Sequence, residues 1–420
     1  MIYIHVPFCR SFCTYCGFYS EICSRKETQQ VQNRFFEDYA DALCAEIEVR
    51  RAKIAAARRA SATSPGFSLG PVAPDTLYIG GGTPSVLPAE VLKRIVDALG
   101  PSDYEEFTIE VNPDDIVSGG AAFAAALRDL GVNRISMGVQ SFDDGILRWM
   151  NRRHDAAQAR EAFRLLRAAG FANISIDLIF GLSQLTDGLW EDTVGEALSL
   201  RPEHISAYQL SIEEDSALEE MVRSGRYTEA SDEQCRRQYD TLCRRLAEAG
   251  YLHYEISNWA LPGREAVHNS AYWRRVPYVG LGPGAHSFCL TGHGAAPSSL
   301  PGSDSSLSDP DARFFPLSDP GIRSWNSQEL ARRDVSGNLL SWLPESEALS
   351  EREAAEETVM LALRTSHGLP LSLLRRLSPS APIDDLLLAG SLQLIPPEPR
   401  VRIPEDRFFV SDAIISRLLP

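Results

Sequence analysis

Residues 1–20 read MIYIHVPFCRSFCTYCGFYS, an apolar run that predicts a strand at its start, followed at once by three cysteines. Cys9, Cys13 and Cys16 are spaced C-x3-C-x2-C, so their thiolates converge only if the loop wraps around one object. Structural iron–sulfur clusters usually take four cysteines, and three would leave one iron of a 4Fe–4S cluster open to another ligand. The loop therefore predicts such a cluster.

Two other interpretations of the cysteine loop stay open. A zinc site needs a fourth ligand, for which Cys23 or His5 is available. A disulfide framework belongs to short secreted chains, whereas this chain has 8 cysteines in 420 residues. No basic region followed by a long apolar stretch precedes the loop, so we expect no secretion signal. We favour the iron–sulfur cluster, in a protein of the reducing cytoplasm.

The composition limits the possible partners. The chain carries 57 acidic and 41 basic residues, a formal net charge of −16. A protein that neutralises phosphates needs the opposite balance, so we expect no nucleic-acid partner. No apolar run reaches about 18 residues, so we expect no membrane span. The hydrophobic fraction of 44% is ample for a globular core.

Strand-like and helix-like stretches alternate along the chain. After a long helix over 34–59, apolar strands are predicted at 76–79, 107–111, 134–141, 174–180 and 204–210. Helices are predicted at 88–99, 121–130, 155–169, 187–200 and 231–249. With the first strand, these are six β/α units, which predict an α/β fold: a partial, open (β/α)6 TIM-like barrel, with a doubly wound sheet as the alternative. The strands' near-continuous apolar character predicts burial on both faces.

Polar residues follow or end several of these strands. They are Glu110, Gln140, Asp177 and the glycine turn of Gly81, Gly82 and Thr83. In α/β folds ligands bind at the carboxyl ends of the strands, so we expect these groups to share one site. The glycine turn lacks the Lys of a phosphate-binding loop. It suits a backbone cradle for the charged end of an amino-acid-like ligand.

Several motifs together resemble the radical S-adenosylmethionine (SAM) superfamily. They are the cysteine loop, YIGGGTPS, EVNP, ISMGVQSFDD with MNRRHD, and SIDLIFGL, which cover about residues 1–290 in order. The chain is most similar to the branch that contains coproporphyrinogen dehydrogenases and haem chaperones. The resemblance implies a 4Fe–4S cluster on Cys9, Cys13 and Cys16, and SAM across the barrel mouth.

The resemblance also implies a role for each residue around SAM. Gly81, Gly82 and Thr83, assisted by Glu110, would hold the methionine amino group, and Arg152 would pair with the carboxylate. Gln140 and Asp177 would bind ribose hydroxyls, the backbone around Ala207 would contact adenine, and Tyr3 would pack beside methionine.

Two features of this sequence differ from the dehydrogenase branch. In the dehydrogenase the third cysteine is followed by x-Cys, but here Gly17 and Phe18 follow it, and only eight residues precede Cys9. Both favour a haem chaperone, which would bind haem and pass it to recipient proteins and would need an electron donor. The alternative is an oxygen-independent coproporphyrinogen dehydrogenase that decarboxylates its substrate oxidatively through a 5′-deoxyadenosyl radical. Whether the chain is an enzyme stays open.

A later stretch, HNSAYW at residues 268–273, resembles a haem-binding motif of the chaperones. His268 would be an axial ligand of haem iron, since neutral imidazole is a usual ligand. Tyr272 and Trp273 offer flat surfaces for a porphyrin. The alternative is a structural histidine in a capped loop with core aromatic residues.

The composition changes along the chain predict three domains. Residues 1–250 form the barrel, and 251–344 form an extension that contains a Ser-, Pro-, Gly- and Asp-rich insertion at 291–320. Residues 345–420 form a small α+β domain of winged-helix type. Its predicted elements are helices at 351–364, 371–377 and 384–390 and a strand at 408–410.

Overall fold

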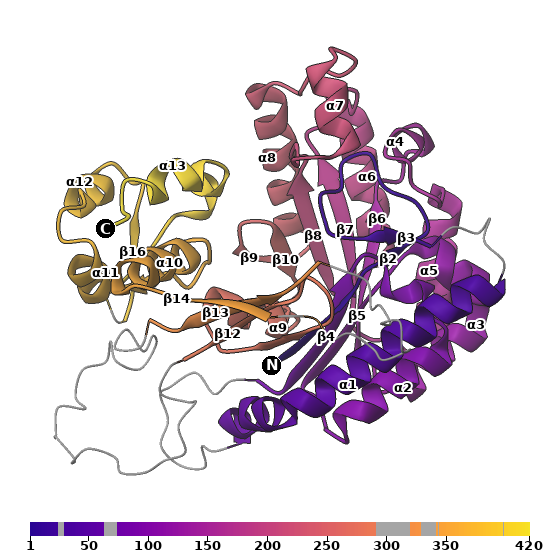
Figure 1. Ribbon diagram of the computed structural model, residues 1–420. Coiled ribbons are helices and arrows are strands. Elements are labelled where there is room, and N and C mark those ends of the chain that lie inside the picture. Colours follow the sequence, from indigo (N-terminus) through magenta and orange to yellow (C-terminus); the bar gives the residue numbers. More distant parts are fainter. Residues whose placement is uncertain (24–28, 63–73, 291–319, 329–341, 343, 398) are drawn as a thin grey trace, which may run out of the picture.

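The computed structural model describes residues 1–23, 29–62, 74–290, 320–328, 342, 344–397 and 399–420. Its centre is a nine-stranded sheet in the order β11-β1-β4-β5-β6-β7-β8-β10-β9 (Figure 1). The strands are β1 (Ile2–Val6), β4 (Thr76–Gly81), β5 (Glu106–Val111), β6 (Arg134–Gln140), β7 (Ile174–Phe180), β8 (His204–Gln209), β9 (Leu252–Glu255), β10 (Asn258–Ala260) and β11 (Val279–Leu281).

The parallel α/β architecture confirms the predicted fold class. The six predicted strands, β1 and β4–β8, are all present and pair in parallel. Three short strands were not predicted: β11 adds to β1 in parallel, and β10 and β9 continue the sheet beyond β8 in antiparallel pairing. Among the described strands the two edges, β11 and β9, do not pair with each other, so the barrel is open.

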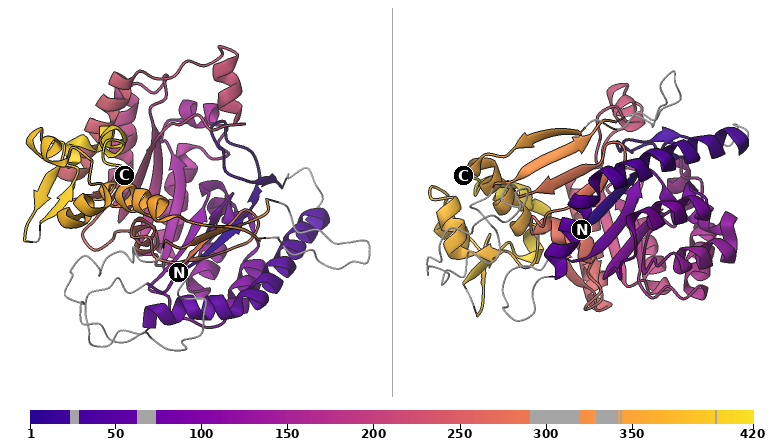
Figure 2. Two further views of the ribbon diagram at one scale, coloured as in Figure 1. Left: turned by 60° about the vertical axis from the view of Figure 1, so that its left-hand side comes forward. Right: turned by 60° about the horizontal axis from the view of Figure 1, so that its bottom comes forward.

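Helices pack on the outer side of this sheet, and α4 and α7 lie beyond the carboxyl ends of its strands (Figures 1 and 2). They are α1 (Gln29–Ala62), α2 (Ala89–Leu99), α3 (Pro113–Asp129), α4 (Asp144–Trp149), α5 (Ala156–Ala168), α6 (Asp187–Leu200), α7 (Ala217–Arg223) and α8 (Asp232–Glu248). Side chains cap most of them; Asp155 and Gln158 form a capping box at α5. α3 begins eight residues before the predicted 121, since Asn112 caps a first segment that a kink at Gly120, where φ is 61°, separates from the predicted helix.

The strands alternate between an apolar outer face and a polar inner face. In β5, Phe107 and Ile109 are buried among apolar residues, whereas the residues between and beside them are polar. Inward-facing side chains bond to one another across strands: Ser136 on β6 donates to Asp177 on β7, and Ser175 bonds to His204 on β8. The predicted burial on both faces is confirmed, since consecutive residues of β5, β6 and β7 are buried or half-buried, but the inner face is lined by polar side chains.

A second, antiparallel sheet follows the barrel. Its strands are β12 (His286–Cys289), β13 (Ile322–Asn326) and β14 (Pro344–Ala348). The predicted insertion at 291–320 lies, except for its last residue, outside the described residues. Since β14 pairs with β13, the second sheet continues across the predicted boundary at residue 345. The central sheet likewise continues past residue 250, and the three-domain division stays a prediction.

The C-terminal unit lies beside the barrel (Figures 1 and 2). Its elements are α10 (Glu351–Leu363), β15 (Leu369–Pro370), α11 (Leu371–Leu377), α12 (Ile383–Leu388), β16 (Gln393–Ile395), β17 (Arg400–Arg402), η4 (Glu405–Val410) and α13 (Ser411–Ile415). The helix–strand–helix–helix–strand–strand order and the three-stranded antiparallel sheet agree with a winged-helix-like unit.

One C-terminal prediction was wrong: residues 408–410 are not a strand but the end of η4. Phe408 and Phe409 instead pack on the barrel, with ring centroids 4.9 Å from His253 and 5.5 Å from Tyr239. This ring packing explains why the run is apolar although it forms no strand. In the described part of the chain, no helix is both long and apolar enough to cross a membrane.

Candidate functional site

The three predicted cluster ligands lie on one loop with half-buried, unpaired thiols. A short parallel pair, β2 (Phe8–Cys9) and β3 (Glu21–Ile22), joins its two ends, and Cys23 N–H donates to the carbonyl of Cys9 at 2.7 Å. Burial raises the pKa of Cys16 to about 11, and the nearby thiols of Cys13 and Cys9 raise it as well. Three thiolates this close together would repel one another, so all three can be deprotonated only when a positive group binds them.

The segment after α4 holds this loop in place. Thr14 N–H donates to the carbonyl of Met150 at 3.1 Å, and the Thr14 hydroxyl donates to Trp149 at 2.8 Å. Asn151, whose φ of 57° is left-handed, donates through Nδ2 to the carbonyl of Phe12 at 2.6 Å. The MNRRHD stretch therefore holds the cysteine loop in place through hydrogen bonds, which was not predicted.

Arg152 and Gln140 meet beside this loop. Arg152 Nη1 lies 3.3 Å from Cys13 Sγ, and Nη2 donates to the carbonyl of Gly138. A Cβ on Gly138 would lie 2.9 Å from Gln140 Nε2 and 3.3 Å from Arg152 Nη2, so the glycine leaves room for both side chains. Gln140 has a left-handed φ of 70° next to a register shift between β6 and β7. Such strain is common at ligand sites.

The glycine turn lies directly against the cysteine loop. A Cβ on Gly82 would come within 2.7 Å of the carbonyl oxygen of Phe8. Because glycine allows this approach, Thr83 Oγ1 lies 3.4 Å from Cys9 Sγ. Gly81 has a φ of 112°, which only glycine adopts readily, and its missing side chain accommodates the His5 ring. The predicted turn and the predicted cluster ligands are thus neighbours.

Glu110 lies behind the glycine turn. Tyr78 Oη donates to Oε1 at 2.8 Å, and Gly81 N–H donates to Oε2 at 3.1 Å. Burial raises the pKa of Glu110 to about 7, the charge of Asp177 adds to this effect, and the two hydrogen bonds oppose it. A carboxylate next to a backbone turn can accept an ammonium group, as predicted for it.

Asp177 lies nearer the middle of its strand than predicted. It is the fourth of the seven residues of β7, level with Gly138 and Ser206 on the adjoining strands, rather than at the strand end. Ser136 donates to it at 3.1 Å and Ser175 at 3.4 Å. Burial raises its pKa, while the hydroxyl of Ser206 and other donors lower it.

Tyr3 and Ala207 complete the predicted set. Tyr3 Oη lies 3.1 Å from His5 Nδ1, and His5 Nε2 lies 3.0 Å from the carbonyl of Tyr19, so His5 links β1 to the end of the cysteine loop. Ala207 N–H donates to the carbonyl of Ser257 at 2.8 Å. This N–H is therefore occupied, and contact with adenine at Ala207 needs another backbone group.

His268 lies at the other end of the barrel. It is on α9 (Val267–Trp273) and is fully buried. Its Nδ1 lies 2.7 Å from Oγ1 of Thr76, the first residue of β4, and its Nε2 lies 2.8 Å from Tyr272 Oη. The glycine turn is at the last residues of the same strand, so the structure does not bring His268 together with the cysteine loop.

The surroundings of His268 favour a neutral, anchored ring. Burial lowers its pKa to about 3. Glu106 accepts the N–H groups of Val267 at 2.8 Å and of His268 at 3.0 Å, which fixes the start of α9. With both ring nitrogens bonded, His268 has no free lone pair for haem iron in this conformation. The predicted ligand role therefore requires α9 to move.

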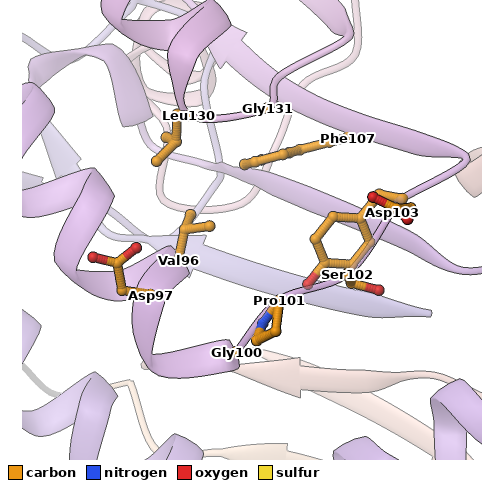
Figure 3. Close-up of a pocket in the computed structure, with 10 residues that line it drawn as sticks. Val96, Asp97, Gly100, Pro101, Ser102, Asp103, Phe107, Leu130 and Gly131 are labelled. Atoms are coloured by element: carbon orange, nitrogen blue, oxygen red, sulfur yellow. The ribbon is translucent and has the colours of Figure 1, made fainter.

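The described residues contain a surface pocket that is separate from this site. It lies between α2 and the start of β5, beside Val96, Pro101, Phe107 and Leu130 (Figure 3). None of the predicted site residues lines it. In the same part of the chain, no three His, Cys, Asp or Glu side chains converge at a spacing that suits one metal ion.

The comparisons with known proteins agree with the geometry. A model of the Radical SAM superfamily matches residues 69–197. "Heme chaperone HemW" of Bacillus subtilis (strain 168) is 35% identical over 293 residues, which are 68% of this chain and 70% of that protein. The chain belongs to the HemW family. Membership of the radical SAM superfamily implies a 4Fe–4S cluster and SAM.

Two further relatives extend the comparison. A protein of Danio rerio, "Radical S-adenosyl methionine domain-containing protein 1, mitochondrial", is 28% identical over 385 residues, 88% of this chain and 73% of that one. The structure of coproporphyrinogen III oxidase (HemN) from Escherichia coli matches with a TM-score of 0.69 and 20% identity, over 100% of this chain and 89% of that one. At this identity the match shows the fold alone.

Proposed function

We propose that this HemW-family protein is a haem chaperone built on a radical SAM core. The observation that carries the proposal is the 35% identity to a protein named heme chaperone, across 70% of that protein's length. It would bind haem and pass it to recipient proteins, and it would draw on an electron donor. A cytoplasmic location suits its reduced, clustered cysteines.

Cys9, Cys13 and Cys16 would hold the 4Fe–4S cluster. The support is their shared loop, its anchoring to the segment after α4, and the hydrogen bond that the guanidinium of Arg152 donates to Cys13. When bound, the cluster supplies a free iron for SAM and an electron for its reductive cleavage.

SAM would lie between the glycine turn and the carboxyl ends of β6 and β7. Gly81, Gly82, Thr83 and Glu110 would hold its amino group, because a carboxylate and a turn lie together there. Arg152 would take the carboxylate, Gln140 and Asp177 the ribose hydroxyls, Tyr3 the methionine, and the backbone near Ala207 the adenine. The contacts of Gln140 and Arg152 over Gly138 support this assignment.

Haem would reach His268 only in an open state. We propose that α9 swings out, which breaks the His268 bonds to Thr76 and Tyr272 and the bonds from the start of α9 to Glu106. The flat rings of Tyr272 and Trp273 would then be available beside an imidazole. The proposal explains how a buried histidine could become a ligand.

The coproporphyrinogen dehydrogenase alternative is not better supported than the chaperone. Gly17 occupies a place where a Cβ would lie 2.6 Å from Glu213 Cβ, so the loop after the third cysteine is closely packed. Phe18, which replaces the expected cysteine, is exposed. The HemN structure shares the fold only.

A paired assay on anaerobically reconstituted protein tests the proposal. We expect haem binding in a spectroscopic titration, and no conversion of coproporphyrinogen when SAM and a reductant are supplied. A protein that decarboxylates coproporphyrinogen and binds no haem would refute the chaperone function. A protein that binds no cluster would refute the radical SAM core as well.

A further inference from the structure

A buried ionic cluster lies under the candidate site, formed by two carboxylates and two guanidiniums. Arg153 Nη2 lies 3.0 Å from Asp115 Oδ2, and Nη1 bonds to Asp114. Arg10 Nε lies 3.5 Å from Asp115 Oδ1. The side chains of Asp115 and Asp114 are only 5% and 10% exposed, so these ion pairs are shielded from solvent. Shielded pairs interact more strongly than those on a surface.

Asp115 is the centre of this cluster because it contacts three separate segments. The hydroxyl of Ser85, just after the glycine turn, donates to Oδ2 at 2.9 Å. Arg10 follows the first cysteine directly, and Arg153 follows Arg152 directly. One carboxylate therefore joins the cysteine loop, the glycine turn and the arginine segment.

Hydrogen bonds of the main chain hold the ionic cluster at the start of α3. Asn112 N–H donates to Ser85 Oγ at 3.0 Å, and the Asn112 side chain accepts the N–H of Asp114 at the start of α3. Both carboxylates thus sit in the first turn of α3, where the helix dipole favours negative charge. The rigid end of α3 fixes Asp115, and Asp115 fixes the three segments.

We propose that Asp115 and Arg153 are positioning residues that hold Arg152 and the glycine turn at the distance from the cysteine loop that SAM needs. This inference rests on the proposed cluster and SAM sites. In this inference, neither residue touches SAM. Their ion pair makes SAM affinity depend on where the cysteine loop holds the 4Fe–4S cluster.

The test uses full-length protein with a reconstituted cluster. Asp115→Asn keeps the size and removes the charge, Arg153→Met removes the cation, and Arg153→Lys keeps a cation without the bidentate geometry. SAM affinity is measured by calorimetry, and the reduced cluster is followed by electron paramagnetic resonance with and without SAM. Glu196→Gln, which breaks the exposed Arg160–Glu196 pair of 2.9 Å, is the control.

We expect wild-type iron content in Arg153→Lys and a loss of SAM affinity of about ten- to a hundredfold in Asp115→Asn and Arg153→Met, with Arg153→Lys between them and wild type. The SAM-induced spectral change should shrink in the same order. Unchanged affinity and spectra in Arg153→Lys and Asp115→Asn would overturn the inference. A wild-type protein whose spectrum ignores SAM would refute the proposed function, and this inference with it.

Discussion

Arg152 directs its guanidinium at Cys13, with Nη1 3.3 Å from Sγ, while Nη2 donates to the carbonyl of Gly138 on β6. One half-buried cation thus contacts both the cysteine loop and the barrel. Under the proposed function, Arg152 would pair with the carboxylate of SAM while Cys13 would hold the 4Fe–4S cluster.

The cysteine loop provides the first prediction. Cys9→Ala, Cys13→Ala and Cys16→Ala should each abolish the cluster, because three protein thiolates are the minimum for holding it, whereas wild type should carry about four irons per chain. Iron analysis and the visible spectrum after anaerobic reconstitution measure this. Cys44→Ala, on α1, is the control and should keep its iron. A normal cluster in Cys13→Ala would disprove the ligand assignment.

The second prediction concerns SAM contacts. Arg152→Ala and Asp177→Ala should each weaken SAM binding about ten- to a hundredfold, because each removes a charged hydrogen-bond partner worth about 1.5–3 kcal/mol. Calorimetry on cluster-loaded protein provides the affinity, and iron content shows that the cluster persists. Equal SAM affinity in both variants and wild type would mean that SAM binds elsewhere.

The third prediction is a pH dependence caused by Glu110. Burial raises its pKa to about 7 in the folded protein, whereas a free Glu titrates near about 4.3. The stabilisation by its protonated form is therefore complete below about pH 4.3 and is lost as pH rises through about 7. Glu110→Gln should remove this loss, so its advantage over wild type in free energy of unfolding should grow from about pH 5 to about pH 8.

Denaturant unfolding across that pH range measures the difference between the two proteins. Taking the difference cancels the contribution of the buried carboxyl of Glu255, whose pKa is also raised. A constant difference between Glu110→Gln and wild type would show that the pKa of Glu110 is not raised in the folded protein.

The fourth prediction tests the opening of α9. Thr76→Val and Tyr272→Phe each free one nitrogen of the His268 ring, so each should raise haem affinity about tenfold or more by favouring the open state. His268→Ala should lose haem binding and shift the Soret band. Haem titration measures both effects. If His268→Ala binds haem with the wild-type spectrum while it unfolds more easily, His268 has only a structural role.

Much of the fold follows from the sequence, because the β/α repeat is strong. The predicted strand at 174–180 and the predicted helices at 187–200 and 371–377 match the structure residue for residue. The missed strands β9, β10 and β11 have only three or four residues each, too few for an apolar pattern to mark them. The polar inner face was visible in alternating runs such as ISID, but the apolar content of the strands concealed it.

The site was harder to predict where contacts join distant segments. Asp115 and Arg153 are 38 residues apart, and no local pattern links them. The place of His268 depends on β10, which runs antiparallel to β8 and returns the chain to the start of that strand. A motif identifies residue types, but the direction of the preceding strand decides which end of the barrel they occupy.

Outward and inward side chains alternate along β4–β8. The outward side chains stabilise the fold, and the inward ones are available to bind ligands. Outward side chains such as Ile109 and Ile135 pack against the helices, while the inner wall interacts through hydrogen bonds. Libraries restricted to inward positions, with one hydrogen-bonding residue replacing another, should therefore retain a large fraction of folded variants. The barrel would then be an evolvable scaffold, whose interior can be altered for new ligands while its outer layer stays constant.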